Sequence, residues 1–305
     1  MKTRLPKWHR TCSRLCDRHE GEETAVRVSK FDAWGNDFLV LDLADMRTQL
    51  TGHASADAQN VDWPTVARTW CNRASGIGAD GLLLLERIDD VNARMKLYNS
   101  DGSTAEMSGN GARCFAHALY RADDARGEKV YRLHTDAGER QVTVGVRSAE
   151  SVMASVDMGE ITRIDAPTGW NAIGTHPDRP VMHLSVGNPH SVVGVEDVAT
   201  VDVLKLGRMV PQVNLEVVAP GPESNAITMR VHERGAGITQ ACGTGACASA
   251  WAAAAWGIVA QPAERCEVVV HMPGGDAIVT VNAPSKGRVI LTGPAVFVGT
   301  YEVTM

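Results

Sequence analysis

AEMSGNGARC, at residues 105–114, and TQACGTGACA, at residues 239–248, are two versions of one short pattern. Their matching positions hold small residues: Gly109, Gly111 and Ala112 in the first copy, and Gly243, Gly245 and Ala246 in the second. The centres differ, because Ser108 stands where the second copy has Cys242. In each copy a β-rich run precedes the Gly-rich turn and a helix-like run follows it, so we predict a strand, a turn and a helix at both places.

The chain outside these copies also repeats itself. The two centres lie 134 positions apart, and each half alternates short β-rich runs with few helices. We interpret this as a duplication, and we predict an α+β fold of two pseudo-symmetric halves, each a curved, barrel-like sheet around a central helix. The central helices are expected at residues 111–122 and 245–256. The halves are expected at residues 26–150 and 151–289, with a C-terminal strand at 290–305 that returns to the first half.

Two local signals add detail to the first half. A Gly35–Asn36 turn is expected between the first two strands. A helix is expected at residues 63–72, since Asp62 can cap it and Pro64 suits its first turn.

The paired turns also suggest chemistry. A Gly-rich turn that opens a helix presents free backbone N–H groups and the positive end of the helix dipole, and it therefore suits an anion such as a carboxylate. A cysteine there is expected to have a lowered pKa. If the two turns face each other, Ser108 and Cys242 flank one carbon, which suits removal of a proton on one face and delivery on the other. We expect no cofactor and no metal, so N–H donors would stabilise the carbanion.

The composition excludes several classes of protein. The chain has 305 residues, of which 44% are hydrophobic and 22% are charged, and this is an ordinary globular balance. The net charge of -6 argues against a general nucleic-acid binder. The seven cysteines include no C-x-x-C pair, so we expect reduced thiols in a cytoplasmic protein rather than a zinc site.

Two segments require a separate interpretation. Residues 1–25 are basic at the start and contain no apolar run, so we expect a disordered extension rather than a secretory signal. Residues 241–260 carry no charge over a bilayer-spanning length. Their small residues favour a buried, Ala-rich core helix over a membrane span.

The chain resembles the diaminopimelate epimerase family. The resemblance covers residues 28–305 and is carried by separate motifs, namely FDAWGNDFLVLD, GIGADGLLL, YNSDGSTAEMSGNGARC, SVGNPH, HERGAGITQACGTGACA and LTGPAVFV. It implies cofactor-independent interconversion of LL- and meso-diaminopimelate, a small amino-acid substrate of the lysine and peptidoglycan pathway. A homodimer is one assembly compatible with it. Related proline racemases and hydroxyproline epimerases usually carry a histidine where this chain has Asn110, so they rank lower.

The resemblance also implies roles for individual residues. Cys242 matches one catalytic cysteine, and Ser108 stands where the other is usual. The backbone groups expected to hold the reacting carboxylate are those of Gly109, Asn110, Gly243 and Thr244. The remaining polar residues expected to bind substrate are Asn36, Asn99, Asn188, Asn214, Glu233 and Arg234, with His190 beside the site. Gly81 stands where the family often has glutamine, so one side-chain contact is expected to be missing or replaced.

Each assignment has a structural alternative, and Ser108 leaves the function open. Asparagines beside turns are common without any ligand, Arg234 could form a surface ion pair, and His190 could be structural. A serine hydroxyl cannot act as a base without a neighbouring base. Four accounts remain: a subfamily that still epimerises, an engineered change, an epimerase of another amino acid such as hydroxyproline, and a non-catalytic amino-acid-binding homologue. We favour the first, because the surrounding substrate set is intact.

Overall fold

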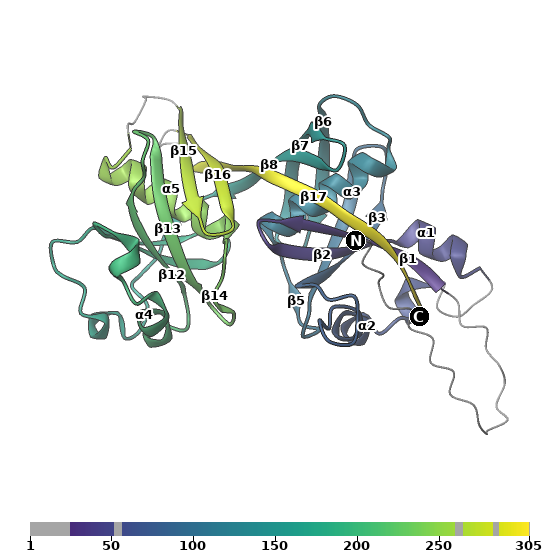
Figure 1. Cartoon of the computed structure of the whole chain (residues 1–305), viewed down its shortest axis with the longest axis horizontal. Helices are drawn as coiled ribbons and strands as arrows, with labels where there is room; N and C mark the ends of the chain where they lie inside the picture. The colour runs from purple at the N-terminus through teal and green to yellow at the C-terminus, as the bar shows by residue number, and fades with distance from the viewer. Residues whose placement is uncertain (1–24, 52–56, 260–264, 283–286, 305) are drawn as a thin grey trace, which may run out of the picture.

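A computed structural model describes residues 25–51, 57–259, 265–282 and 287–304. The predicted N-terminal extension lies outside the described residues, apart from Ala25. Figure 1 shows two lobes side by side, each a curved sheet with a helix inside it. The predicted α+β architecture of two barrel-like halves is confirmed.

The first lobe contains ten helices and strands. Two strands and two helices come first, and three strands, one helix and two strands follow. They are β1 (Ala25–Ala33), β2 (Asn36–Asp42), α1 (Leu43–Gln49), α2 (Trp63–Trp70), β3 (Gly81–Arg87), β4 (Asn92–Asn99), β5 (Thr104–Ala105), α3 (Gly109–Ala122), β6 (Lys129–Thr135) and β7 (Gly138–Ser148). A short 3-10 turn, η2 (Ala58–Asn60), precedes α2.

The second lobe repeats most of this order. Its elements are β10 (Val181–Ser185), β11 (Pro189–Gly194), α4 (Val203–Met209), β12 (Asn214–Pro220), β13 (Ala226–Glu233), β14 (Gly237–Ile238), α5 (Gly243–Trp256), β15 (Arg265–Met272) and β16 (Gly275–Asn282), with 3-10 turns η3 (Trp170–Ile173) and η4 (Val198–Thr200). The pairing is repeated as well: β2 runs parallel to β3 as β11 does to β12, and β4 runs parallel to β6 as β13 does to β15.

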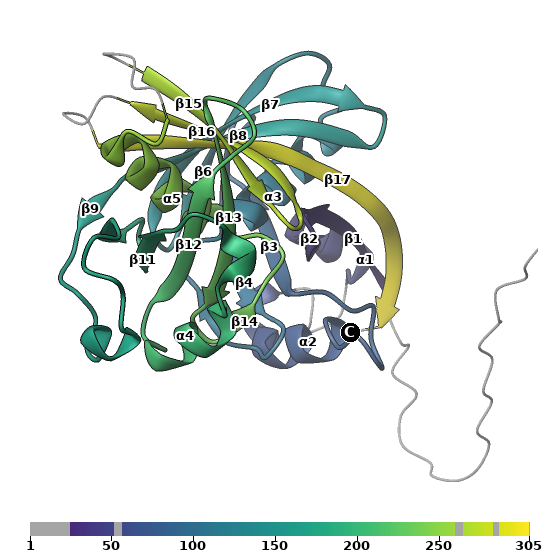
Figure 2. The same ribbon diagram turned by 60° about the vertical axis from the view of Figure 1, so that its left-hand side comes forward.

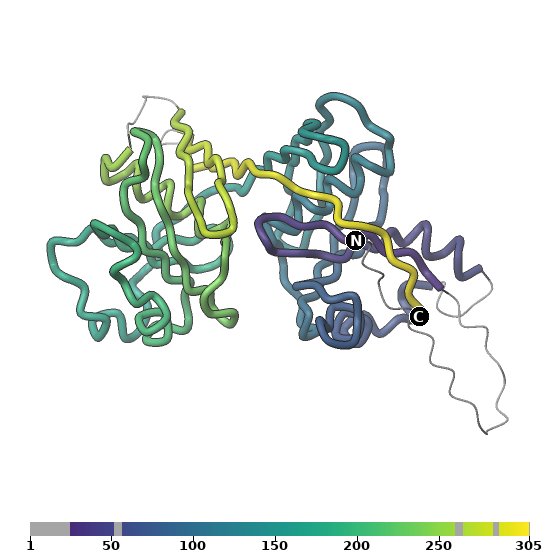
Figure 3. The backbone as a smooth tube through the Cα atoms, viewed as in Figure 1, coloured from purple at the N-terminus to yellow at the C-terminus, as the bar shows by residue number. Residues whose placement is uncertain are grey.

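Two long strands join the lobes and close both sheets. β8 (Ser151–Glu160), continued by β9 (Thr162–Arg163), pairs with β7 in the first lobe and with β10 in the second. β17 (Arg288–Thr304) pairs with β16 in the second lobe and with β1 in the first, and it also pairs with β8. Figure 3 shows the yellow β17 trace passing from one lobe to the other. Each lobe is therefore completed by a strand that also belongs to its neighbour.

The central helices lie where the two Gly-rich turns predict them, with each start two residues earlier than expected. α3 contacts every long strand around it, and α5 is buried on almost all sides, so both are core helices. Figure 2 shows both helices enclosed by strands. The uncharged stretch at residues 241–260 includes α5, which has only 14 residues. No helix among the described residues is long and apolar enough to cross a membrane.

The structure confirms the predicted start of α2 but not the predicted position of the first turn. Asp62 caps α2 by accepting a hydrogen bond from the Thr65 N–H, and Pro64 lies in the first turn, as predicted. The first hairpin turn is Trp34–Gly35 rather than Gly35–Asn36, because Ala33 pairs with Asn36 and both turn residues have positive φ. Helices α1 and α4, seven residues each, were not predicted, since such short helices follow buried strands with little periodicity of their own.

Candidate active site

The N-termini of the two central helices carry Ser108 and Cys242 in equivalent positions. Each residue is an N-cap in extended conformation, with φ and ψ of -137° and 126° for Ser108 and -130° and 112° for Cys242. The Ser108 hydroxyl accepts a hydrogen bond from the Gly111 N–H at 3.0 Å, and the Cys242 sulfur accepts one from the Gly245 N–H at 3.3 Å. The two side chains therefore hold the same place in their helices although their chemistry differs.

The two helix starts also meet in space. A Cβ atom added to Gly243 would lie 4.0 Å from Cα of Gly109 and 3.2 Å from Oδ1 of Asn110. Among the described residues, no acceptor is bonded to the backbone N–H groups of Gly109, Asn110, Gly243 or Thr244. Two positive helix ends with free donors therefore converge, which makes a strong position for one carboxylate.

Cys242 is buried, with 4% of its surface exposed, and its pKa is shifted in the direction opposite to the prediction. Burial raises the pKa of the thiol well above its ordinary value, and the negative charges of Glu233 and Glu216 raise it further. Hydrogen bonds from Thr244 and the Gly245 N–H oppose this shift but do not reverse it. The expectation of a lowered pKa is wrong, because the helix end is outweighed by desolvation and by two carboxylates.

Glu233 gives Cys242 a partner for proton exchange. Burial raises the pKa of this carboxyl, although hydrogen bonds from Thr239 and Cys242 act against the shift. The two groups raise each other's tendency to hold a proton, because each has a raised pKa and Glu233 is among the charges that raise the pKa of Cys242. The Cys242 side of the site therefore has both an acid and a base.

Ser108 has no such partner. Its hydroxyl accepts from Gly111, and among the described residues no carboxylate or imidazole is bonded to it. A Cβ added to Gly111 would instead meet Cζ of Phe38 at 3.6 Å, so the surroundings beneath Ser108 include an apolar ring. The hydroxyl can donate a hydrogen bond, but in the part of the chain that the structure describes no base is bonded to it that could withdraw its proton.

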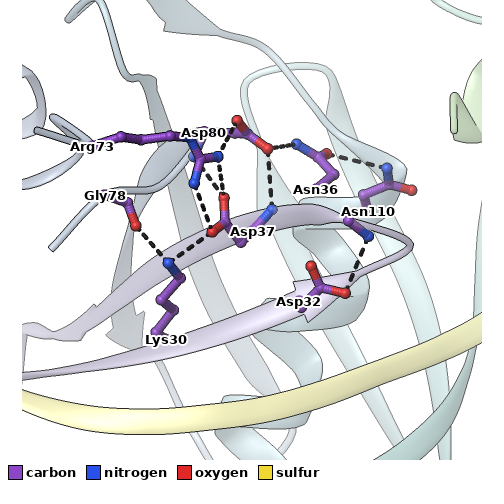
Figure 4. Close-up of polar contacts among 9 residues, drawn as sticks. Lys30, Asp32, Asn36, Asp37, Arg73, Gly78, Asp80 and Asn110 are labelled. Atoms are coloured by element: carbon purple, nitrogen blue, oxygen red, sulfur yellow. Dashed lines mark hydrogen bonds and ion pairs between the residues drawn. The ribbon is translucent and has the colours of Figure 1, made fainter. Parts of the chain in front are cut away.

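On the Ser108 side, a chain of polar contacts orients the two asparagines (Figure 4). Asp80 accepts from the Asn36 amide at 2.7 Å, and Asn36 Oδ1 accepts from the Asn110 amide at 3.1 Å. Asn110 Oδ1 in turn accepts from Arg113 at 2.7 Å. Burial lowers the pKa of Arg113 to about 10, so this fully buried guanidinium remains a cation at neutral pH. Asn36 and Asn110 are therefore fixed from both ends.

Asp37 anchors the same region through ion pairs. Its carboxylate lies 2.7 Å from the Lys30 ammonium and 2.7 Å from the Arg73 guanidinium, which also binds Asp80 (Figure 4). Burial alone would raise the pKa of Asp37, but the hydrogen bonds from Arg73 and Lys30 outweigh it and lower the pKa. The contacts tie the loop between α2 and β3 to the first hairpin.

This cluster predicts a pH-dependent loss of stability. A carboxyl whose pKa is lower in the folded protein than in the unfolded chain stabilises the fold at pH values above its unfolded-state pKa. This stabilisation is lost as the pH falls through the folded-state pKa. Asp37→Asn is expected to lower the free energy of unfolding by about 1.5–3 kcal/mol at neutral pH, the range for hydrogen bonds to charged groups. Urea denaturation at pH 7 and at pH 3 measures this, and the difference from the parent should shrink at acid pH. Equal stability of the two proteins at pH 7 would contradict the assignment.

On the Cys242 side, the equivalent chain contains a buried ion pair. His190 Nδ1 lies 2.7 Å from Glu216 Oε1, and its Nε2 lies 2.9 Å from Asn188 Oδ1. The Asn188 amide donates to the Thr244 hydroxyl at 3.3 Å. Both His190 and Glu216 are completely buried. Glu216 was missed in the sequence, although a single charge inside the apolar run NLEVVAP was the available signal.

The match that decides the family covers both repeats. The model of the family described as Diaminopimelate epimerase matches residues 33–164 and 182–298. The chain belongs to the diaminopimelate epimerase family. A diaminopimelate epimerase of Desulfitobacterium hafniense is 35% identical over 291 residues, which cover 90% of this chain and 96% of that protein. Another, of Thermosynechococcus vestitus, is 37% identical over 304 residues, which cover 90% of this chain and 99% of that protein.

Solved structures with the same fold are more distant. A Bacillus anthracis phenazine biosynthesis protein of the PhzF family gives a TM-score of 0.67 at 15% identity, over 92% of this chain and 99% of that one. A hydroxyproline epimerase from Agrobacterium vitis, with bound trans-4-OH-L-proline, gives a TM-score of 0.58 at 15% identity, over 92% of this chain and 91% of that one. These likenesses show the fold that members of the diaminopimelate epimerase family share with other proteins.

The remaining residues that the family resemblance singled out lie at strand ends. Asn214 opens β12 and accepts a hydrogen bond from the Arg234 N–H at 2.8 Å, so these two are brought together. The Arg234 side chain is exposed and has no acidic partner among the described residues. Asn99 ends β4 as Glu233 ends β13 and lies opposite Gly81 in β3, but its side-chain amide donates to Ser103. Among the described residues, no side-chain hydrogen bond joins Asn99 to the asparagines of the site.

Gly81 has a packing reason for its missing side chain. It opens β3 next to β4, and an added Cβ would lie 2.8 Å from the backbone oxygen of Tyr98. Glycine therefore fits this backbone, whereas the glutamine often found in the family would require the strands to move apart.

Proposed function

We propose that this protein interconverts LL- and meso-diaminopimelate without a cofactor, by acid–base transfer of the α-proton. The observation that carries the proposal is the meeting of two helix N-termini, capped by Ser108 and Cys242, around four free N–H donors. Family membership supports diaminopimelate as the substrate, since the relatives from Desulfitobacterium hafniense and Thermosynechococcus vestitus are diaminopimelate epimerases.

In the proposed reaction the substrate carboxylate binds between the two helix ends. Negative charge that develops when the α-proton leaves is stabilised by the N–H donors and by both helix dipoles. On one face, the Cys242 thiol and the Glu233 carboxylate exchange the proton with the α-carbon. On the other face, the Ser108 hydroxyl donates its proton to the α-carbon. The alkoxide that remains takes a proton from bulk water, and the Cys242–Glu233 pair returns the proton it removed to bulk water, so both groups are restored. We propose that the serine slows the reaction but does not abolish it.

The distal end of the substrate is assigned to Arg234. Its exposed guanidinium, without an acidic partner among the described residues, suits the second carboxylate of diaminopimelate in a bidentate pair. A homodimer and a cytoplasmic location stay predictions, which sedimentation and cell fractionation can test.

Arg234→Lys tests the distal site. Lysine keeps the charge but loses the planar fork, so binding of diaminopimelate is expected to weaken by about 1–3 kcal/mol, the range for hydrogen bonds to charged groups. Calorimetric titration measures the affinity, and thermal unfolding should be nearly unchanged. Unchanged affinity together with a lower melting temperature would make Arg234 a structural residue instead.

Net turnover tests the function itself. The protein is incubated with LL-diaminopimelate, and the two stereoisomers are separated by chiral chromatography, with trans-4-hydroxy-L-proline in a parallel reaction. We expect conversion of diaminopimelate and none of hydroxyproline. Binding of diaminopimelate without conversion would support the non-catalytic homologue, and conversion of hydroxyproline would support the other epimerase.

A further inference from the structure

The duplication provides an internal comparison for the buried pair His190–Glu216. β2 and β3 pair in parallel with Phe38 opposite Gly81, just as β11 and β12 pair with His190 opposite Asn214. Phe38 therefore corresponds to His190. Glu216 is the third residue of β12, and the third residue of β3 is Leu83.

In each lobe one member of the pair lies beneath the start of the central helix. A Cβ added to Gly111 of α3 would touch the Phe38 ring at 3.6 Å, whereas a Cβ added to Gly245 of α5 would lie 2.7 Å from Glu216 Oε1. The lobe with the hydroxyl thus has an apolar pair beneath its helix start, and the lobe with the thiol has an ion pair there.

The fold does not require this ion pair. Burying two charges costs desolvation free energy, and an apolar pair of similar size often gives equal or greater stability. The first lobe builds the same frame with Phe38 and Leu83, both almost fully buried. Moreover, Glu216 Oε2 is buried and has no hydrogen-bond partner within the described ranges, which is a further cost. A charged pair retained at such a cost, where apolar residues suffice, indicates a role in the chemistry of the site.

The contacts of the pair lead to the thiol. From Glu216 the chain passes through His190 and Asn188 to the Thr244 hydroxyl, which lies 3.5 Å from the Cys242 sulfur. Oxygen atoms of Glu216 and Asn188 face the two ring nitrogens of His190, so the imidazole is held from both sides. The corresponding chain in the first lobe starts at Asp80 and ends on Arg113, and it does not include Ser108.

We infer that Glu216 is a positioning residue for Cys242, which holds His190, Asn188 and Thr244 in line and places a fixed negative charge beneath the thiol. The inference rests on the proposed function, because it assigns Glu216 a part in that reaction. Gly245 is needed for this arrangement, since any larger residue would collide with the carboxylate.

The expected effect on the thiol has a definite sign. The titratable groups that face Cys242 are Glu233 from β13 and Glu216 from β12, with His190 from β11 in contact with Glu216. Both carboxylates raise the pKa of Cys242 and so keep it protonated. Removal of the Glu216 charge should therefore let the thiolate form at lower pH.

Two variants test the inference. Glu216→Gln keeps the size and removes the charge. The double variant His190→Phe/Glu216→Leu copies the apolar pair of the first lobe and is expected to fold with a melting temperature no lower than that of the parent. Ser249→Ala is the control, because Ser249 is a buried polar residue of α5 that contacts Met229 and not the site.

Three readouts separate a positioning role from a structural one. In both test variants kcat for diaminopimelate should fall by about 10²-fold, the loss expected for a misplaced reacting group, while KM stays near that of the parent. The ultraviolet absorbance of the Cys242 thiolate, taken as the difference from a Cys242→Ala protein, should appear at lower pH in Glu216→Gln. Thermal unfolding and the Ser249→Ala control should show no comparable change.

The outcomes are distinct. Unchanged kcat together with an unchanged thiolate titration would overturn the inference. The inference would also be overturned if the variants lost activity together with a lower melting temperature while the thiolate titration of Cys242 stayed the same as in the parent. If the parent does not convert diaminopimelate at all, the proposed function fails, and the thiolate titration still decides whether Glu216 acts on Cys242.

Discussion

Cys242→Ser is expected to lower kcat in both directions of epimerisation by about 10²–10⁴-fold, the usual contribution of a general acid–base group. The hydroxyl can still accept the Gly245 N–H, so the helix cap is retained and the fold should be stable. Glu233 would lose the thiol that is hydrogen-bonded to it. Steady-state turnover of both isomers measures the loss.

Cys266→Ser is the matched control for this change. Cys266 is also buried, with 6% of its surface exposed, but it lies in β15 opposite Val281 of β16 and has no contact with the capping residues among its described partners. Its replacement should leave kcat close to that of the parent. Comparable losses in the two variants, or a Cys242→Ser protein with normal turnover, would remove Cys242 from the reaction.

Ser108→Cys is expected to raise turnover of diaminopimelate by up to about 10²-fold, the lower end of the contribution of a general base. A thiol can ionise far more readily than a hydroxyl, so the second face of the α-carbon would gain a group that removes protons as well as donating them. Because Ser108 and Cys242 have the same backbone conformation and the same capping bond, the new thiol should take an equivalent position. The kcat values of both variants for each isomer test this.

Ser108→Ala is the matching variant that is expected to lose activity. It removes the hydroxyl that accepts a hydrogen bond from the Gly111 N–H. It should be slower than the serine protein, because no donor remains on that face. A serine protein that turns over rapidly, with no gain in Ser108→Cys, would mean that the hydroxyl has a base of its own in the bound state.

Much of the architecture was accessible from the sequence, because the signals were local and repeated. The Gly-x-Gly turns before α3 and α5 located both central helices, and Asp62 located the start of α2. The sequence also predicts a C-terminal strand that returns to the first half, and β17 pairs with β1 there, with Ala25 opposite Thr304. The pairings of β17 with β16 and β8 were harder to foresee, since they depend on how the two lobes meet.

The sequence predicts which residues belong to the candidate site better than it predicts the burial and charges around them. The pKa shift of Cys242 depends on burial and on the charges of Glu233 and Glu216, and these result from tertiary packing rather than from the helix start that was visible in the sequence. Likewise, the bonds from Asn36 to Asp80 and Asn110 join residues 44 and 74 positions apart. Turn propensity explains why an asparagine follows Gly35, but only the fold shows what it holds.

The most direct test of the account is exchange of the α-proton in heavy water, followed separately for LL- and meso-diaminopimelate by NMR or mass spectrometry. In the proposed reaction, Cys242 with Glu233 removes a proton from its own face, whereas Ser108 has no base bonded to it among the residues described. The account predicts that one isomer exchanges much faster than the other in the serine protein, and that Ser108→Cys reduces this difference. Equal and rapid exchange of both isomers in the serine protein, or exchange of neither, would contradict it.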